Sequence, residues 1–208
     1  QMLLKINKHE IISWEGKLRP SLEYTGIYPR VENGELPIWI ATGGTPESSL
    51  RAGAFGLPIT YAIIGGNPRR FARNIEIYKS IALSYGHDPS KLPIGVHSWG
   101  YVAETDEQAK REFFPSLKAH QDIIGKERGW PAFDENAFER EIGSHGAIYL
   151  GSPETVAQKI IDTIETLGIN RFMIHTPVGS MPHEYVMNSI RLFGERVKPI
   201  VDKYFEDK

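Results

Sequence analysis

The sequence predicts an α/β fold built on a parallel sheet. Four continuous apolar runs alternate with stretches of helical periodicity, and they cover residues 38–42, 59–64, 94–103 and 171–176. Continuous apolar runs are typical of strands that are buried on both faces. Strand–helix alternation at this spacing is typical of βαβ units, whose strands are parallel.

The composition indicates an ordinary globular protein. Hydrophobic residues make up 40% of the chain and charged residues 24%, and the net charge is −2. A nucleic-acid-binding protein needs a basic surplus, so we expect no nucleic-acid partner. No apolar run approaches the ~18 residues of a membrane span, and no signal peptide is evident, so we expect a cytoplasmic protein without a membrane partner.

The residue types exclude several kinds of site. The chain has no cysteine, which rules out disulfides, thiolate metal sites, iron–sulfur clusters and cysteine nucleophiles. No HExxH motif, GxSxG motif or Walker loop is present. We therefore expect no metal site.

The sequence of residues 1–36 gives little indication of regular secondary structure. The first six residues follow an apolar helical pattern that has no capping residue before it, which indicates a chain cut within a helix. Prolines and glycines interrupt every periodicity over 14–36, so this stretch is expected to be irregular.

Five helices are expected between and after the apolar runs. Each has an apolar stripe at helical spacing or clear capping residues, and Pro199 is expected to kink the last one. The predicted ranges are 46–54, 67–85, 105–129, 152–167 and 182–205. We predict one domain over 1–208, with an insertion at 105–150 that holds more than a crossover helix.

One turn motif occurs three times: glycine, a capping residue, then proline. The copies are Gly44-Thr45-Pro46, Gly66-Asn67-Pro68 and Gly151-Ser152-Pro153. Helix capping alone explains these residues. Alternatively, a glycine-rich turn at a helix N-terminus binds an anion through backbone N–H groups. The first copy is the best candidate, because its doubled glycine directly follows a strand and Thr45 and Ser48 add hydroxyls. The Gly65-Gly66 turn with Arg69 and Arg70 comes second.

Two histidines are weak candidates for catalysis. His97 lies in the third apolar run, where alternation places it on one face with Trp99 and places Ser98 on the other. His175 lies near the end of the fourth run, where active sites of parallel barrels are found. A histidine of a buried strand is equally compatible with a hydrogen-bonded core residue.

Several motifs together resemble the bacterial-luciferase-like flavin oxidoreductases. They are WEGK at 14–17, IWIATGGTPES at 38–48, GLP at 56–58, YGHDP at 85–89 and GSPETVA at 151–157. The resemblance extends over nearly the whole chain but corresponds only to the C-terminal part of the family.

The resemblance implies a parallel (β/α)8 barrel of the TIM type, of which this chain holds about four strands, the fifth to the eighth. It also implies a flavin-phosphate site at Gly43, Gly44, Thr45 and Ser48, although Gly44 stands where luciferase has an acidic residue. Contacts of the phosphate with the backbone are still possible with glycine at position 44, whereas contacts with a side chain are not.

The implied activity is that of a flavin-dependent monooxygenase, using reduced FMN and O₂ on a small organic substrate. Two alternatives stay open: a reductase that transfers hydride from a deazaflavin coenzyme, and a non-catalytic flavin-binding protein. The resemblance also implies a homo-oligomer, a dimer in the intact protein, and a separate flavin reductase as partner. We expect the 208-residue chain alone to be inactive.

An incomplete barrel leaves its inner face open. Trp39, Tyr61 or Trp99 is expected on that face, depending on the parity of each strand. We expect either that copies associate through it or that the chain was cut only after the complete barrel had assembled. The insertion at 105–150 is the only segment long enough to cover it.

Overall fold

The computed structural model describes all 208 residues and divides them into two compact units, Gln1–Ile38 and Trp39–Lys208. The single-domain prediction for 1–208 stays a prediction, and each unit is described by itself. No helix combines the length and the apolarity that crossing a bilayer requires.

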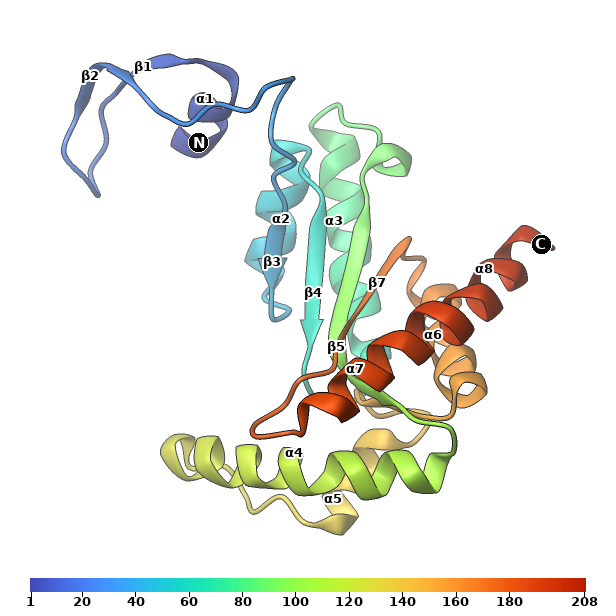
Figure 1. The fold of residues 1–208 in the computed structure, drawn as a ribbon. Coiled ribbons are helices and arrows are strands. Elements are labelled where there is room, and N and C mark those ends of the chain that lie inside the picture. Colours follow the sequence, from blue (N-terminus) through green and yellow to red (C-terminus); the bar gives the residue numbers. More distant parts are fainter. The chain divides into compact units, whose positions relative to one another are not determined.

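The first unit holds a helix and a two-stranded antiparallel sheet (Figure 1). Its elements are α1 (Met2–Lys8), β1 (Ile11–Trp14) and β2 (Leu22–Gly26). The expectation of an irregular 14–36 was therefore wrong for β2. The side chains of this strand are exposed or half-buried, so it lacks the apolar signal by which a strand is recognised. The Arg30 guanidinium closes the end of α1 by donating to the carbonyl oxygens of Ile6 (2.7 Å) and Asn7 (3.0 Å).

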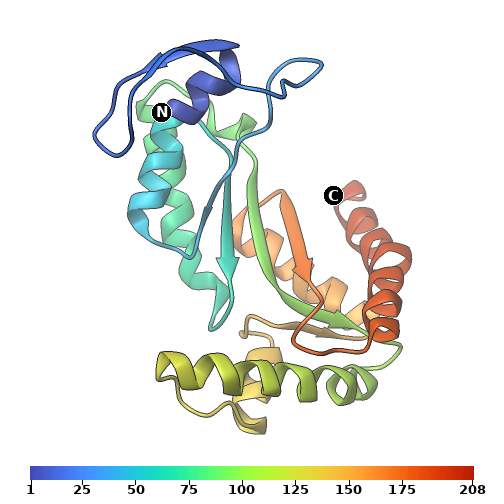
Figure 2. The same ribbon diagram turned by 60° about the vertical axis from the view of Figure 1, so that its left-hand side comes forward.

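The second unit is built on a parallel sheet of five strands. The four predicted strands are confirmed as β3 (Ile40–Thr42), β4 (Ile59–Ile63), β5 (Ile94–Val102) and β7 (Arg171–His175). The order is β3-β4-β5-β6, and β7 pairs with β5. Figure 2 shows β3, β4, β5 and β7 side by side.

The fifth strand, β6 (Tyr149–Gly151), corrects the prediction of four. It lies within the stretch assigned to the insertion and pairs only with the last three residues of β5, Gly100–Val102. A run of three buried residues is too short to stand out from the pattern.

Helices cover one side of this sheet. They are α2 (Pro46–Phe55), the 3₁₀ turn η1 (Pro68–Phe71) with α3 (Ala72–Ser84), α6 (Pro153–Leu167), α7 (His183–Leu192), η3 (Phe193–Val197) and α8 (Lys198–Glu206). A further 3₁₀ turn, η2 (Pro89–Lys91), precedes β5. The predicted helix 182–205 is thus interrupted, because the residues before Pro199 form a π-helical turn. Proline cannot donate the hydrogen bond that a regular helix needs at that point.

The two faces of the sheet differ in burial. Ile59, Tyr61, Ile63 and Val96 point toward the helices and are completely buried. On the other face, His97 and Trp99 of β5 are only half-buried, as are their partners Met173 and His175 on the neighbouring strand β7. The second face is the open inner face expected of an incomplete barrel.

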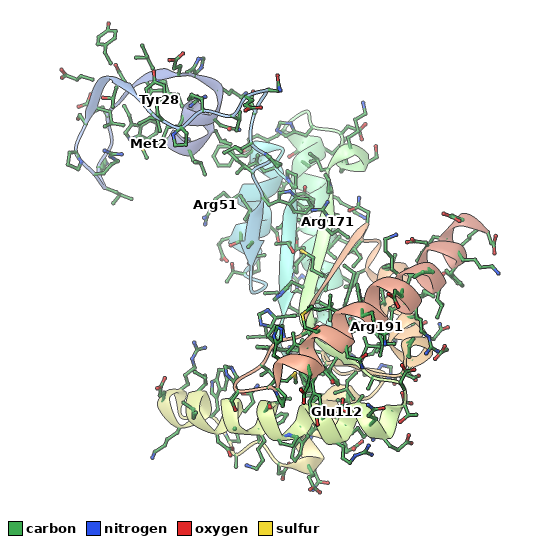
Figure 3. All side chains as sticks on the ribbon, viewed as in Figure 1. Met2, Tyr28, Arg51, Glu112, Arg171 and Arg191 are labelled. Carbon is green, nitrogen blue, oxygen red and sulfur yellow. The ribbon has the colours of Figure 1, made fainter.

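Strand parity resolves which aromatic residues lie on the open face. Trp99 lies there, and Tyr61 lies on the helix-covered face. Trp39 precedes β3 by one residue, and alternation places it with Ala41 on the open face. The guanidinium of Arg171, which is labelled in Figure 3, lies 4.9 Å from the Trp39 ring centre.

The predicted insertion forms α4 (Asp106–Arg128), α5 (Glu135–Ile142) and β6. Helix α4 crosses the carboxyl ends of β4 and β5 (Figures 1 and 2). Phe113 and Leu117 of α4 and Phe138 of α5 form one buried cluster with Tyr101, and Trp99 packs against it. The segment therefore covers the carboxyl end of the open face.

We predict that Lys159 is essential for the stability of the junction between α5 and β6. Its ammonium donates to the carbonyl oxygens of Ile142 (3.0 Å), Gly143 (2.6 Å) and Ile148 (2.7 Å). Each buried acceptor left without a donor costs about 1–3 kcal/mol, so Lys159→Met is expected to lower the free energy of unfolding by more than about 2 kcal/mol in urea titrations. Lys110 pairs with Glu139 at the surface, and Lys110→Met serves as the control, with a loss below about 1 kcal/mol. Equal losses in both variants would contradict the prediction.

Candidate functional site

A cleft of about 380 Å³ lies at the carboxyl ends of the strands. Gly43 follows β3, Gly65 and Arg70 follow β4, and Trp99 lies on β5. The α4–α5 segment contributes the other side of the cleft, including Gln121 and Trp130. Binding sites of parallel α/β proteins lie at this end of the strands.

The first glycine turn connects β3 to α2 and brings the four predicted phosphate-binding residues together. Gly44 has φ +108°, which favours glycine, and its N–H donates to the Thr42 hydroxyl at 3.1 Å. A side chain at Gly44 would also meet the Phe71 ring. Gly44 is therefore required by the turn itself.

Gly43 has a different environment. It is exposed, lines the cleft, and has no atom within 4 Å of the position that a Cβ would occupy. The hydroxyls of Thr45 and Ser48 lie 2.8 Å apart beside it at the start of α2. Since the first N–H groups of a helix have no intrahelical acceptor, an anion placed here meets backbone donors and hydroxyls.

Helix α3 holds the first turn in position. The Asn74 amide donates to the Gly44 carbonyl oxygen at 2.6 Å. The Tyr61 hydroxyl donates to the Asn74 carbonyl oxygen at 3.2 Å and lies 2.8 Å from the Ser49 hydroxyl. Burial raises the pKa of Tyr61 to about 12, so this chain of bonds stays neutral at physiological pH.

The second glycine turn is occupied by a carboxylate of the chain itself. The Gly66 N–H donates to both carboxylate oxygens of Glu141, at 3.0 and 3.1 Å. The Ala147 N–H donates to the same carboxylate at 3.1 Å. The anion-binding capacity of this turn is used to attach α5.

The third glycine turn is occupied in the same way. The Asp106 carboxylate accepts from the Ser152 N–H at 2.6 Å and from the Thr155 hydroxyl at 3.1 Å. Asp106 begins α4, so this contact joins the N-termini of α4 and α6. In the first turn, by contrast, the hydrogen-bonded partners are the Thr42 hydroxyl and the Asn74 amide, and no carboxylate takes part.

Arg70 adds a positive charge to the cleft. Its exposed guanidinium lies 3.5 Å from the Gly65 carbonyl oxygen, and it shares the cleft with Gly43. An anion bound at the first turn therefore has a cation in the same cleft.

The two candidate histidines lie together on the open face. The rings of His97 and His175 are 5.4 Å apart between centres, and His175 meets Trp99 edge-on at 4.5 Å. His120 of α4 lies 5.7 Å from Trp99 on this face. Burial and the neighbouring His175 lower the pKa of His97 below its usual 6.5. No group of side chains could hold a metal ion.

Several residues of the site had no signal in the sequence. Asn74, His120, Glu141 and Asp106 reach it from helices that are distant in the chain. Thr42 could have been predicted from the sequence, because a hydroxyl two residues before Gly44 is placed to accept from the Gly44 N–H and close a tight turn.

The family model for luciferase-like monooxygenases matches residues 1–171. The chain belongs to this family. It is 24% identical over 200 residues to the alkanal monooxygenase alpha chain of Aliivibrio fischeri, which covers 84% of this chain and 54% of that protein. The chain thus spans about half the length of this relative.

Solved structures show the same fold. Monooxygenase RslO1 from Streptomyces bottropensis superimposes with a TM-score of 0.73 at 22% identity, covering 94% of this chain and 57% of that one. The oxygenating constituent of 3,6-diketocamphane monooxygenase from Pseudomonas putida, in complex with FMN, gives 0.61 at 21% identity, covering 95% and 60%. The coenzyme F420-dependent tetrahydromethanopterin reductase from Methanopyrus kandleri gives 0.66 at 15% identity, also covering 95% and 60%. The fold is thus part of a TIM-type barrel.

We predict that His97 makes the fold sensitive to acid. Because its pKa is lowered in the folded state, the unfolded chain binds more protons below pH 6.5. The free energy of unfolding should therefore fall as the pH drops from 6.5 to about 5, and His97→Gln should make this fall shallower. Urea titrations at several pH values measure both. An unchanged pH dependence in His97→Gln would contradict the prediction.

Proposed function

We propose that the protein is a flavin-dependent monooxygenase that binds the phosphate of FMN at Gly43, Gly44, Thr45 and Ser48. One observation carries this proposal. Two of the three equivalent turns hold a carboxylate of the chain, whereas the first holds none and opens into the cleft. The filled turns demonstrate that this geometry suits anions, and the first is left for an external one.

The residues present fit a flavin phosphate. Gly43 leaves space for close approach to the backbone, the hydroxyls of Thr45 and Ser48 supply further polar contacts, and Arg70 supplies charge. The exposed Glu47 in the first turn of α2 opposes an anion and weakens the site somewhat. When bound, reduced FMN supplies the electrons with which O₂ is activated and one oxygen atom is inserted into a small organic substrate.

The second candidate function is hydride transfer from a deazaflavin coenzyme. It is favoured by the structural similarity to the F420-dependent reductase, since the same fold and the same kind of turn would hold that coenzyme. Cofactor spectra and oxygen consumption with reduced FMN distinguish the two activities. Absence of both would favour a non-catalytic flavin-binding protein.

The proposal includes a cellular setting and partners. We propose a cytoplasmic homo-oligomer that receives reduced FMN from a separate flavin reductase. His97 and His175 are proposed to contribute to catalysis from the open face. The 208-residue chain alone is proposed to be inactive and to bind flavin weakly, because an incomplete barrel provides only part of the wall around the flavin ring.

We predict that Gly43→Val weakens FMN binding at least about tenfold, the effect of losing one charge-assisted hydrogen bond. The new side chain would block the approach of the phosphate to the backbone, and Gly43 has no positive φ that would strain valine. FMN fluorescence titrations at high chain concentration measure the affinity. Gly44→Val is less informative because Phe71 and the positive φ make it disruptive.

Two controls accompany this test. Riboflavin lacks the phosphate, so its affinity should not change in Gly43→Val. Gly194→Val places the same side chain in open space elsewhere and should leave FMN binding intact. Equal FMN affinity in Gly43→Val and the unchanged chain would refute the phosphate site.

We also predict that the chain self-associates. The edges of β3 and β7 are unpaired, and the open face between them includes Trp39, Trp99 and Met173. Light scattering should give a mass that rises with concentration, and an apolar dye should bind. Met173→Asp should shift the equilibrium toward monomer, whereas Met187→Asp on α7 should not. A monomer at every concentration that binds no dye would contradict the prediction.

A further inference from the structure

We infer that the cleft binds a planar aromatic substrate that carries an oxygen substituent, held between Trp99 and the segment around Trp130 and Phe133. This inference rests on the proposed function, since it assigns the substrate of the same site.

Aromatic rings reach the cleft from three directions. Phe71 comes from the turn before α3, Trp99 from β5, and Trp130 and Phe133 from the connection between α4 and α5. Flat rings pack best against other flat rings, in stacked or edge-on geometry. The volume of about 380 Å³ falls within the range of small-molecule sites.

The floor of the cleft is fixed. Trp99 is half-buried, packs against the cluster under α4, and is flanked by the imidazoles of His175 and His120 at 4.5 and 5.7 Å between ring centres. These contacts hold the indole ring in one orientation. They also place two groups that can donate or accept hydrogen bonds at the margin of the ring.

The opposite side is held in place from the end of α4. The backbone N–H of Trp130 donates to the Gly125 carbonyl oxygen at 2.9 Å, and the Arg128 guanidinium lies 5.2 Å from the Trp130 ring centre. Phe133 packs edge-on against the buried Phe138. Trp130 nevertheless remains 44% exposed, so a large apolar ring is held at the cleft without being covered.

The polar side chains of the cleft favour a substrate that carries an oxygen substituent. Glu141 is already bonded to the N–H groups of Gly66 and Ala147. With Arg70 assigned to the phosphate, Gln121 remains, and its amide can donate to a carbonyl or phenolic oxygen. A cationic substrate would face the Arg70 charge. An unbranched acyl chain would leave the rings without a matching flat surface.

The test compares two ketones of equal size, 2-acetylnaphthalene and 2-dodecanone, by calorimetric titration of the full chain. We expect the naphthyl ketone to bind at least about tenfold more tightly, and Trp130→Ala to weaken it about tenfold. Trp130→Phe should restore most of the affinity because it keeps a ring. Tyr85→Ala removes an exposed aromatic residue at the end of α3 and should have no effect.

Three outcomes would overturn the inference. The first is equal or tighter binding of 2-dodecanone, and the second is full affinity of Trp130→Ala for the naphthyl ketone. The third is displacement of the naphthyl ketone by saturating FMN, which would assign the cleft to the flavin ring. Gly43→Val separates this inference from the cofactor proposal. If that variant loses FMN but keeps the naphthyl ketone, both stand. If FMN binding is unchanged in it while the ketone results hold, only the phosphate site fails.

Discussion

Strand β5 is the element on which the second unit depends. It is hydrogen-bonded in parallel to β4 and β7 through its first half and to β6 through its last three residues. Because side chains alternate along a strand, this one segment sends Val96 and Ser98 into the helix-covered core and His97 and Trp99 to the open face. A shift of one residue in its register would exchange the two sets and remove both the core and the site.

The glycine turns show how one local structure serves two purposes. Each turn presents backbone N–H groups just before the start of a helix, and buried donors need acceptors. In the second and third turns the N–H groups that meet a carboxylate are those of Gly66 and Ser152, which precede the helices. Glu141 and Asp106 satisfy two of the turns, and in doing so they attach α5 and α4 to the ends of β4 and β6. The segment that covers the carboxyl end of the sheet is therefore held by the same chemistry that a cofactor phosphate would use at the first turn.

The sequence predicted the parts of the fold that have local signals. The four long strands and the capped helices follow from apolar runs and turn residues, and their existence was correct. Strand β6 and the hairpin of β1 and β2 were missed, since the first is only three residues long and the residues of the second, except Ile12, are exposed or half-buried. The turn around Gly44 could be ranked first on its doubled glycine and the hydroxyls of Thr45 and Ser48. The reason that it differs from the other two lies in Glu141 and Asp106, whose partners are 75 and 46 residues away.

The same limit explains why the sequence indicates a cofactor more readily than a substrate. A phosphate is bound by a short contiguous turn, so a few consecutive residues such as Gly43-Gly44-Thr45 report it. The other end of the cleft is assembled from β5, η1 and the α4–α5 segment, and no stretch of sequence contains it. Trp99 is fixed by the sheet, whereas Trp130 and Phe133 lie on a connection that the sheet does not constrain. Changes in that connection would alter the substrate without disturbing the strands or the first turn. In the proposed enzyme, substrate choice would therefore depend on a segment that two carboxylates and the cluster around Tyr101 hold against the sheet.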